Sequence, residues 1–158
     1  MAATHFYGFD SFRGLPDVEG IDQVSNQFFK GQFACSIDEV ERNLSDHGVD
    51  WSRTTLIDGF FSDTLTEESK RYYPFRTVNV AFIDCDLYSS TREVLDWLRD
   101  LLSDGTILLF DDWFAFGPNG ELGQPRAFRE FLEKHPELSA EPFVEFADNG
   151  KGFVLRVA

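Results

Sequence analysis

Two almost entirely apolar segments, residues 78–83 and 106–110, constrain the fold of this chain more than any other feature. Strands that are buried on both faces have such continuous apolar runs, whereas strands exposed on one face alternate apolar and polar residues. Between the two segments, apolar residues recur at intervals of three and four, as on the buried face of a helix. These residues are Val94, Trp97, Leu98, Leu101 and Leu102. A strand, a helix and a strand form a βαβ unit, so the sequence predicts an α/β fold with a mostly parallel sheet.

Shorter patterns predict the elements on both sides of this unit. Ser36 and Glu39 have the spacing of a capping box, which predicts a helix that begins after Ser36 and ends near His47. The other patterns predict strands at residues 5–9 and 54–57, a helix at 125–134, and a closing antiparallel hairpin of residues 142–146 and 152–157. Because no linker or repeat interrupts them, residues 1–158 are expected to form a single domain.

Composition narrows the class of protein. The 158 residues include 28 acidic and 14 basic side chains, a formal net charge of −14 that disfavours a nucleic-acid partner. No apolar run reaches the roughly 20 residues of a membrane span, and the N-terminus lacks the pattern of a signal peptide. We therefore expect no membrane contact and a cytoplasmic location. Cys35 and Cys85 lack a metal-binding spacing and lie in apolar segments, so we expect both to be buried free thiols.

Acidic residues follow the ends of four predicted strands: Asp10, Asp58, Asp84 and Asp111. Because the carboxyl ends of parallel strands share one edge of a sheet, we expect these acids to converge on one site. The βαβ connection brings Asp84 and Asp86 next to Asp111 and Asp112. Carboxylates this close repel one another unless some are protonated or a cation lies between them. Oxygen ligands suit Mg²⁺, Mn²⁺ or Ca²⁺, so the sequence predicts a divalent cation site, with Mg²⁺ or Mn²⁺ preferred.

Four motifs are spread through most of the chain: FDSFRGLP at residues 9–16, GFFSDTL at 59–65, DCDLYSST at 84–91 and FDDW at 110–113. Together and in this order, they resemble the macrocin O-methyltransferase (TylF-like) family, whose members methylate sugar hydroxyls in antibiotic and related pathways. The resemblance implies a Rossmann-like class I methyltransferase fold, with S-adenosylmethionine as the methyl donor. It also implies that the acceptor is a small molecule, through a hydroxyl group of a sugar or related natural product.

The resemblance also implies roles for individual residues. Asp84, Asp111 and Asp112 would hold the metal ion, and Asp86 would act as the general base. Asp10 would bind the ribose hydroxyls of the cofactor, and Ser11 would belong to the same cofactor site. Asp58 and Gly59 would lie near the adenine. In the implied reaction, the metal lowers the pKa of the acceptor hydroxyl, and Asp86 takes its proton as the oxygen attacks the methyl group.

The sequence departs from the family pattern at its start. Family members begin with a strand and a glycine-rich turn that holds the methionine part of the cofactor, and no such segment precedes Tyr7. We therefore expect an N-terminally truncated sheet, which lacks the first family strand between residues 5–9 and 78–83. These residues alone are then expected to bind S-adenosylmethionine weakly or not at all, unless a preceding segment or a partner chain completes the site.

Other classes of function stay open at this point. The segment IDCD at residues 83–86 also resembles the opening motif of haloacid dehalogenase-type magnesium-dependent phosphatases, although Tyr88 stands where those enzymes usually have Thr or Val. The DxD pattern could instead hold a nucleotide sugar in a glycosyltransferase. A non-catalytic, methyltransferase-like fragment is a further alternative, and the oligomeric state stays open, a homo-oligomer included. For an enzyme, residues 17–33 and 114–123 are the expected specificity loops, since loops at strand ends usually carry recognition.

Overall fold

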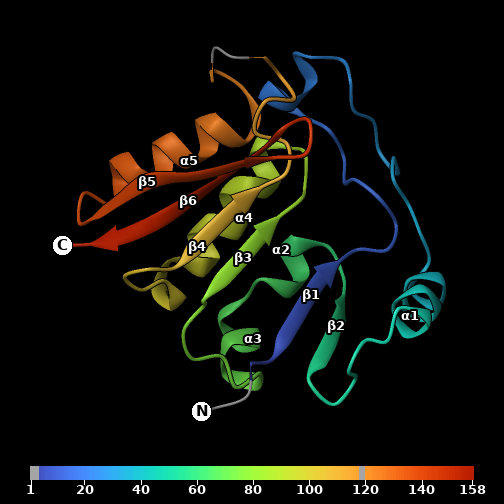
Figure 1. Cartoon of the computed structure of the whole chain (residues 1–158). Helices are drawn as coiled ribbons and strands as arrows, with labels where there is room; N and C mark the ends of the chain where they lie inside the picture. The colour runs from blue at the N-terminus through green and yellow to red at the C-terminus, as the bar shows by residue number, and fades with distance from the viewer. Residues whose placement is uncertain (1–3, 118–119) are drawn as a thin grey trace.

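The computed structural model describes residues 4–117 and 120–158 and has the predicted α/β architecture (Figure 1). The strands in these ranges are β1 Phe6–Asp10, β2 Thr54–Asp58, β3 Val80–Ile83, β4 Ile107–Phe110, β5 Leu138–Phe146 and β6 Gly150–Val157. The α-helices are α1 Ile37–Asp46, α2 Phe61–Thr64, α3 Glu67–Tyr72, α4 Tyr88–Leu98 and α5 Gly123–Lys134. Two 3-10 helices, η1 Gly20–Gln23 and η2 Arg99–Leu101, complete the described elements.

A four-stranded sheet with the strand order β3-β4-β6-β5 forms the larger part of the fold. β3 and β4 are parallel, with Ile83 opposite Phe110, so the acidic residues that follow the two strands start side by side. β6 is antiparallel to both β4 and β5, and β5 and β6 form the closing hairpin. The predicted βαβ unit and C-terminal hairpin are therefore confirmed.

The core of this part lies between the sheet and helices α4 and α5. Leu95 of α4, Leu108 and Phe110 of β4, and Leu155 of β6 are all 0% exposed. Phe128 and Phe131 of α5 pack into the same cluster. Each large apolar side chain buried in this way stabilises a fold by about 1.5–3 kcal/mol relative to the exposed side chain.

The sheet is divided between β1 and β3. β1 pairs in parallel with β2 in a separate two-stranded sheet, and within the described residues no strand is hydrogen-bonded between β1 and β3. The division lies where the sequence predicts a missing strand. Aromatic rings join the two parts instead: Trp97 of α4 contacts Phe9 and Phe75, with ring centroids 5.3 and 5.4 Å apart, and its indole N–H donates to the Thr66 carbonyl at 3.1 Å.

Some local expectations were incomplete and one was wrong. The short helices α2 and α3 were not predicted, although Thr66 and Ser69 form a capping box at the start of α3. Cys85 is buried as expected, but Cys35 is exposed, because the segment before α1 packs against no core.

None of the helices in the described ranges has the length and apolar character needed to cross a membrane. Residues 1–3 of the N-terminus and 118–119 of the second predicted specificity loop lie outside the described residues.

Candidate active site

The three predicted metal ligands lie together where β3 and β4 end. Asp84, Asp111 and Asp112 each offer a carboxylate oxygen, and these oxygens all lie within 4.8 Å of one another. The backbone fixes this spacing, because the Asp111 N–H donates to the Ile83 carbonyl at 3.1 Å and so extends the strand pairing past the strand ends. Carboxylate oxygens at such separations suit a divalent cation with oxygen ligands.

Asp86 belongs to the same site through its backbone. Its N–H donates to Oδ2 of Asp112 at 3.0 Å, and its φ of 56° places it in the left-handed region. That region costs a residue with a Cβ atom about 1–2 kcal/mol. The Leu87 N–H donates to the Cys85 carbonyl at 2.5 Å, so the chain turns sharply around Asp86. The carboxylate of Asp86 is outside the group of three oxygens, but it is close enough for their charges to raise its pKa.

Burial and mutual repulsion raise the pKa values of these acids. Burial, together with the negative charges of Asp112, Asp84 and Asp111, raises the pKa of Asp86 to about 7. Burial, with smaller contributions from Asp84 and Asp111, raises the pKa of Asp112 to about 6, although the hydrogen bond from the Asp86 N–H opposes the rise. The pKa of Asp84 is raised by burial first, and then by Asp111 and Asp10. Neighbouring acids of this kind favour a bound proton or a cation.

Two buried polar residues that sequence reasoning missed hold the chain around the acids. Gln124, 0% exposed at the start of α5, accepts the Asp112 N–H at 2.9 Å and donates to the Ile83 carbonyl at 3.0 Å. Its amide therefore bridges the ends of β3 and β4. Asp22, 4% exposed, accepts backbone N–H groups at the start of α4. No local sequence signal marks either residue, because their partners are distant in sequence.

The predicted cofactor residues lie together at the ends of β1 and β2. Asp10 is opposite Asp58, and the Asp10 carbonyl accepts the Gly59 N–H at 3.0 Å. Asp10 is exposed and its charge acts on the pKa of Asp84, so it lies near the acid cluster. Both carboxylate oxygens of Asp58 accept hydrogen bonds from Arg13, at 3.0 and 3.2 Å. Asp58 therefore already forms an ion pair with Arg13. The Ser11 hydroxyl also has a partner within the chain: it donates to the Gly14 carbonyl at 2.8 Å and stabilises the following turn.

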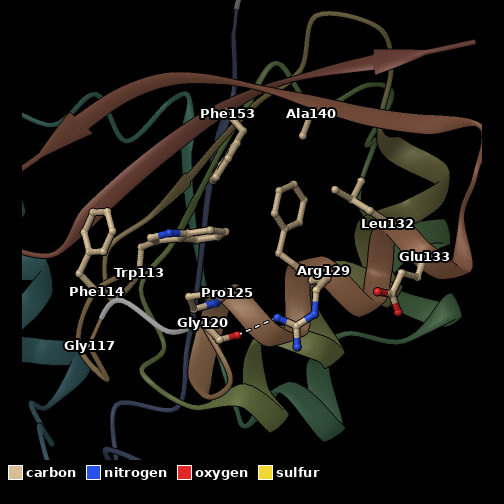
Figure 2. Close-up of a pocket in the computed structure, with 11 residues that line it drawn as sticks. Trp113, Phe114, Gly117, Gly120, Pro125, Arg129, Leu132, Glu133, Ala140 and Phe153 are labelled. Atoms are coloured by element: carbon tan, nitrogen blue, oxygen red, sulfur yellow. Dashed lines mark hydrogen bonds between the residues drawn. The ribbon is translucent and has the colours of Figure 1, made fainter.

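An aromatic pocket begins at Trp113, directly after the two acids that follow β4. Its volume is about 620 Å³, and Figure 2 shows the Trp113 indole between Phe153 and Pro125. The Arg129 guanidinium is fixed at the rim by a 2.9 Å hydrogen bond to the Gly120 carbonyl (Figure 2). A pocket of this size and apolar character could hold part of a small organic molecule.

The sequence matches the macrocin O-methyltransferase (TylF) family over residues 1–135. Over 114 residues it is 31% identical to demethyldecarbamoylnovobiocin O-methyltransferase of Streptomyces niveus. Over 109 residues it is 28% identical to 8-demethyl-8-(2,3-dimethoxy-alpha-L-rhamnosyl)-tetracenomycin-C 4'-O-methyltransferase of Streptomyces olivaceus. These alignments cover 69% and 66% of this chain but only 42% and 40% of the relatives, so the chain spans about two fifths of their length.

The fold is similar to that of solved O-methyltransferases. The structure matches the O-methyltransferase NovP with a TM-score of 0.76 and 26% sequence identity, over 98% of this chain and 60% of NovP. The calicheamicin methyltransferase CalS11 matches at a TM-score of 0.67 and 22% identity, over 95% of this chain and 60% of CalS11. The predicted Rossmann-like class I methyltransferase fold is therefore confirmed. These matches favour the methyltransferase hypothesis over the phosphatase and glycosyltransferase alternatives.

Proposed function

This chain belongs to the macrocin O-methyltransferase (TylF) family, and from that premise we propose that it forms the acid-bearing part of a metal-dependent methyltransferase. The enzyme would transfer a methyl group from S-adenosylmethionine to a hydroxyl of a sugar or related natural product. Two curated relatives support this acceptor class: one acts on demethyldecarbamoylnovobiocin and the other on a rhamnosyl tetracenomycin. An O-methyltransferase from Bacillus cereus, solved in complex with SAH, has the same fold. It matches with a TM-score of 0.53 and 15% identity, over 96% of this chain and 72% of that chain. Its bound SAH is compatible with S-adenosylmethionine as the methyl donor.

The observation that carries the proposal is the approach of three carboxylate oxygens to within 4.8 Å of one another. Asp84, Asp111 and Asp112 would hold Mg²⁺ or Mn²⁺, and they fit such an ion because all three offer hard oxygen donors. The raised pKa values of Asp84 and Asp112 support the same assignment, since the carboxylates are poorly compensated by protein groups alone. When bound, the ion would lower the pKa of the acceptor hydroxyl.

Asp86 is the proposed general base. In the metal-free protein, burial and the neighbouring acids raise its pKa to about 7, and a carboxylate with a raised pKa is a stronger base than an ordinary exposed one. The hydrogen bond from its N–H to Asp112 keeps it beside the three proposed ligands. The aromatic pocket behind Trp113 offers a place for an apolar part of the acceptor, and Asp10 would bind the ribose of the cofactor from the neighbouring strand end.

Metal binding and turnover test the proposal separately. In an isothermal titration with Mn²⁺, we expect Asp111→Asn to weaken binding by about 100-fold, because it removes one charged ligand. Asp46→Asn, at an exposed position on α1, is the matched control and should leave Mn²⁺ affinity unchanged. In a methyl-transfer assay with the segment or partner chain that completes the cofactor site present, we expect Asp86→Asn to lower turnover by about 100-fold or more while Mn²⁺ affinity stays largely intact.

Two results would contradict these assignments. Equal Mn²⁺ affinities of the wild type and Asp111→Asn would remove the metal from the acid cluster. Unchanged turnover of Asp86→Asn would show that Asp86 is not the general base. It would not contradict the metal site.

A further inference from the structure

A buried acid in the long loop between β1 and α1 caps a helix that is distant in sequence. Asp22 lies in η1 and is 4% exposed. Its two carboxylate oxygens accept the N–H groups of Tyr88 at 2.7 Å and Ser89 at 3.1 Å. The N-cap residue of α4 is Leu87, which has no polar side chain, so Asp22 supplies the cap that a local Ser or Asp usually provides. Its negative charge also complements the positive end of the helix dipole.

The turn that carries Asp86 lies directly before this capped helix end. Asp86 has a φ of 56°, a conformation that residues with a Cβ atom disfavour. On one side its own N–H is bound to Asp112, and on the other the N–H groups of the first two residues of α4 are bound to Asp22. Only Leu87 separates the two points of attachment. A turn held this closely has little freedom to relax to a commoner backbone conformation.

Backbone hydrogen bonds and one aromatic contact hold the loop that contains Asp22. The Leu15 N–H donates to the Gln32 carbonyl and the Gly31 N–H donates to the Leu15 carbonyl, both at 2.9 Å, so the loop is closed at its base. Phe28 contacts Phe116 with ring centroids 5.7 Å apart, which joins this loop to the one after β4. Asp22 therefore connects the first predicted specificity loop to the start of α4, and Phe28 joins that loop to the second one.

We propose that Asp22 is a positioning residue that couples the loop of residues 15–32 to the orientation of the Asp86 carboxylate. Its two hydrogen bonds hold the start of α4, and through Leu87 they hold the strained turn at Asp86 against the acid cluster. The contact between this loop and α4 thus stabilises the arrangement of the proposed general base. This inference rests on the proposed function, because it takes Asp86 and the neighbouring acids as the reacting site.

Amide hydrogen exchange and Mn²⁺ titration of the 158-residue chain test this role. The variant is Asp22→Ala, and Ser36→Ala is the matched control, since it removes the side-chain cap of α1 instead. We expect Asp22→Ala to speed exchange of the Asp86 amide, which is bonded to Asp112 rather than to Asp22, by about tenfold. Exchange is measured relative to the Leu108 amide in β4, which reports global unfolding. We also expect about tenfold weaker Mn²⁺ binding, as for other residues that orient metal ligands, and neither effect in Ser36→Ala.

The outcomes separate this inference from the proposed function. Faster exchange at Tyr88 and Ser89 with no change at Asp86 would reduce Asp22 to a helix cap and overturn the positioning role. A response at Asp86 in a chain that fails to bind Mn²⁺ would support the positioning role and contradict the metal site. If Asp22→Ala does not fold, Asp22→Asn replaces it, because it keeps the side-chain volume and one acceptor oxygen while it removes the charge.

Discussion

The two sheets of this protein differ in how firmly they are packed. In the four-stranded sheet, Leu108 and Phe110 are completely buried against α4 and α5. In the two-stranded sheet, Ile57 is the buried residue of β2, and α1 buries none of its side chains. The acid cluster lies on the firmly packed sheet, whereas the predicted cofactor residues lie on the other. A segment with few buried apolar contacts unfolds locally at a lower free-energy cost. We therefore expect the four-stranded sheet with the acid cluster to be rigid and the two-stranded sheet with the predicted cofactor residues to unfold locally more often.

Ligand binding should give the largest difference between the two regions. We expect the 158-residue chain to bind Mn²⁺, while S-adenosylmethionine should give no micromolar affinity, because β1 and β3 lie in separate sheets and no described strand between them holds the cofactor. Isothermal titration with each ligand in turn measures both affinities. Micromolar binding of S-adenosylmethionine by these residues would show that the two-stranded sheet is a sufficient cofactor site, and the comparison would fail.

Truncation of apolar side chains should give the next largest difference. Phe110→Ala removes a ring from the centre of the core and should lower the free energy of unfolding by about 3–5 kcal/mol. Leu44→Ala, on the half-buried face of α1, should cost less, about 1–2 kcal/mol, because the side chain is only partly buried and keeps some contact with water. Urea denaturation measures both changes. Similar losses for the two variants would mean that α1 is as firmly packed as the core.

The pH dependence of stability should give the smallest difference. The raised pKa values of Asp86, about 7, and Asp112, about 6, mean that the folded state binds their protons more tightly than the unfolded state does. The resulting stabilisation is present at low pH and is lost as the pH rises through these values. Between pH 5 and 8 we expect the Tm of the metal-free protein to fall by about 2–4 °C, since partial exposure screens the repulsion.

The other region should respond in the opposite sense and at lower pH. Hydrogen bonds from Ser36 lower the pKa of Glu39, and those from Ser52 lower the pKa of Asp50, so both acids contribute stability above their unfolded pKa values and lose it on acidification. Scanning calorimetry with a chelator present should show a slope between pH 5 and 8 that Asp86→Asn reduces and Asp50→Asn does not. A Tm that stays constant or rises between pH 5 and 8 would contradict the conclusion that repulsion within the acid cluster destabilises the metal-free protein.

Local and periodic patterns made most of the fold predictable from the sequence. The capping box at Ser36 lies where α1 begins, and the apolar runs at residues 78–83 and 106–110 contain β3 and β4. The same rule of strand ends brought Asp84, Asp111 and Asp112 to one place. The roles assigned to these residues remain predictions, as do those of Asp10, Ser11, Asp58 and Gly59.

Residues whose partners are distant in sequence escaped prediction. Gln124 binds the backbone of Ile83, 41 positions away, and Asp22 binds that of Tyr88, 66 positions away. A single Gln or Asp in a loop or helix start is common, and nothing near it in the sequence indicates a buried partner. Cys35 was misjudged for a related reason: its apolar neighbours suggested burial, but the folded chain brings no core against that segment.

The sequence by itself determined the order of the strands and of the three longer helices α1, α4 and α5, the α/β class and the gathering of acids at strand ends. These follow from periodicity and from the geometry of a parallel sheet, which act over short stretches of chain. The tertiary structure alone decided which buried polar groups hold the acids in place and that Asp86 adopts a strained turn. Those features depend on which backbone groups meet after the chain has packed, and that meeting is set by contacts between segments far apart in sequence.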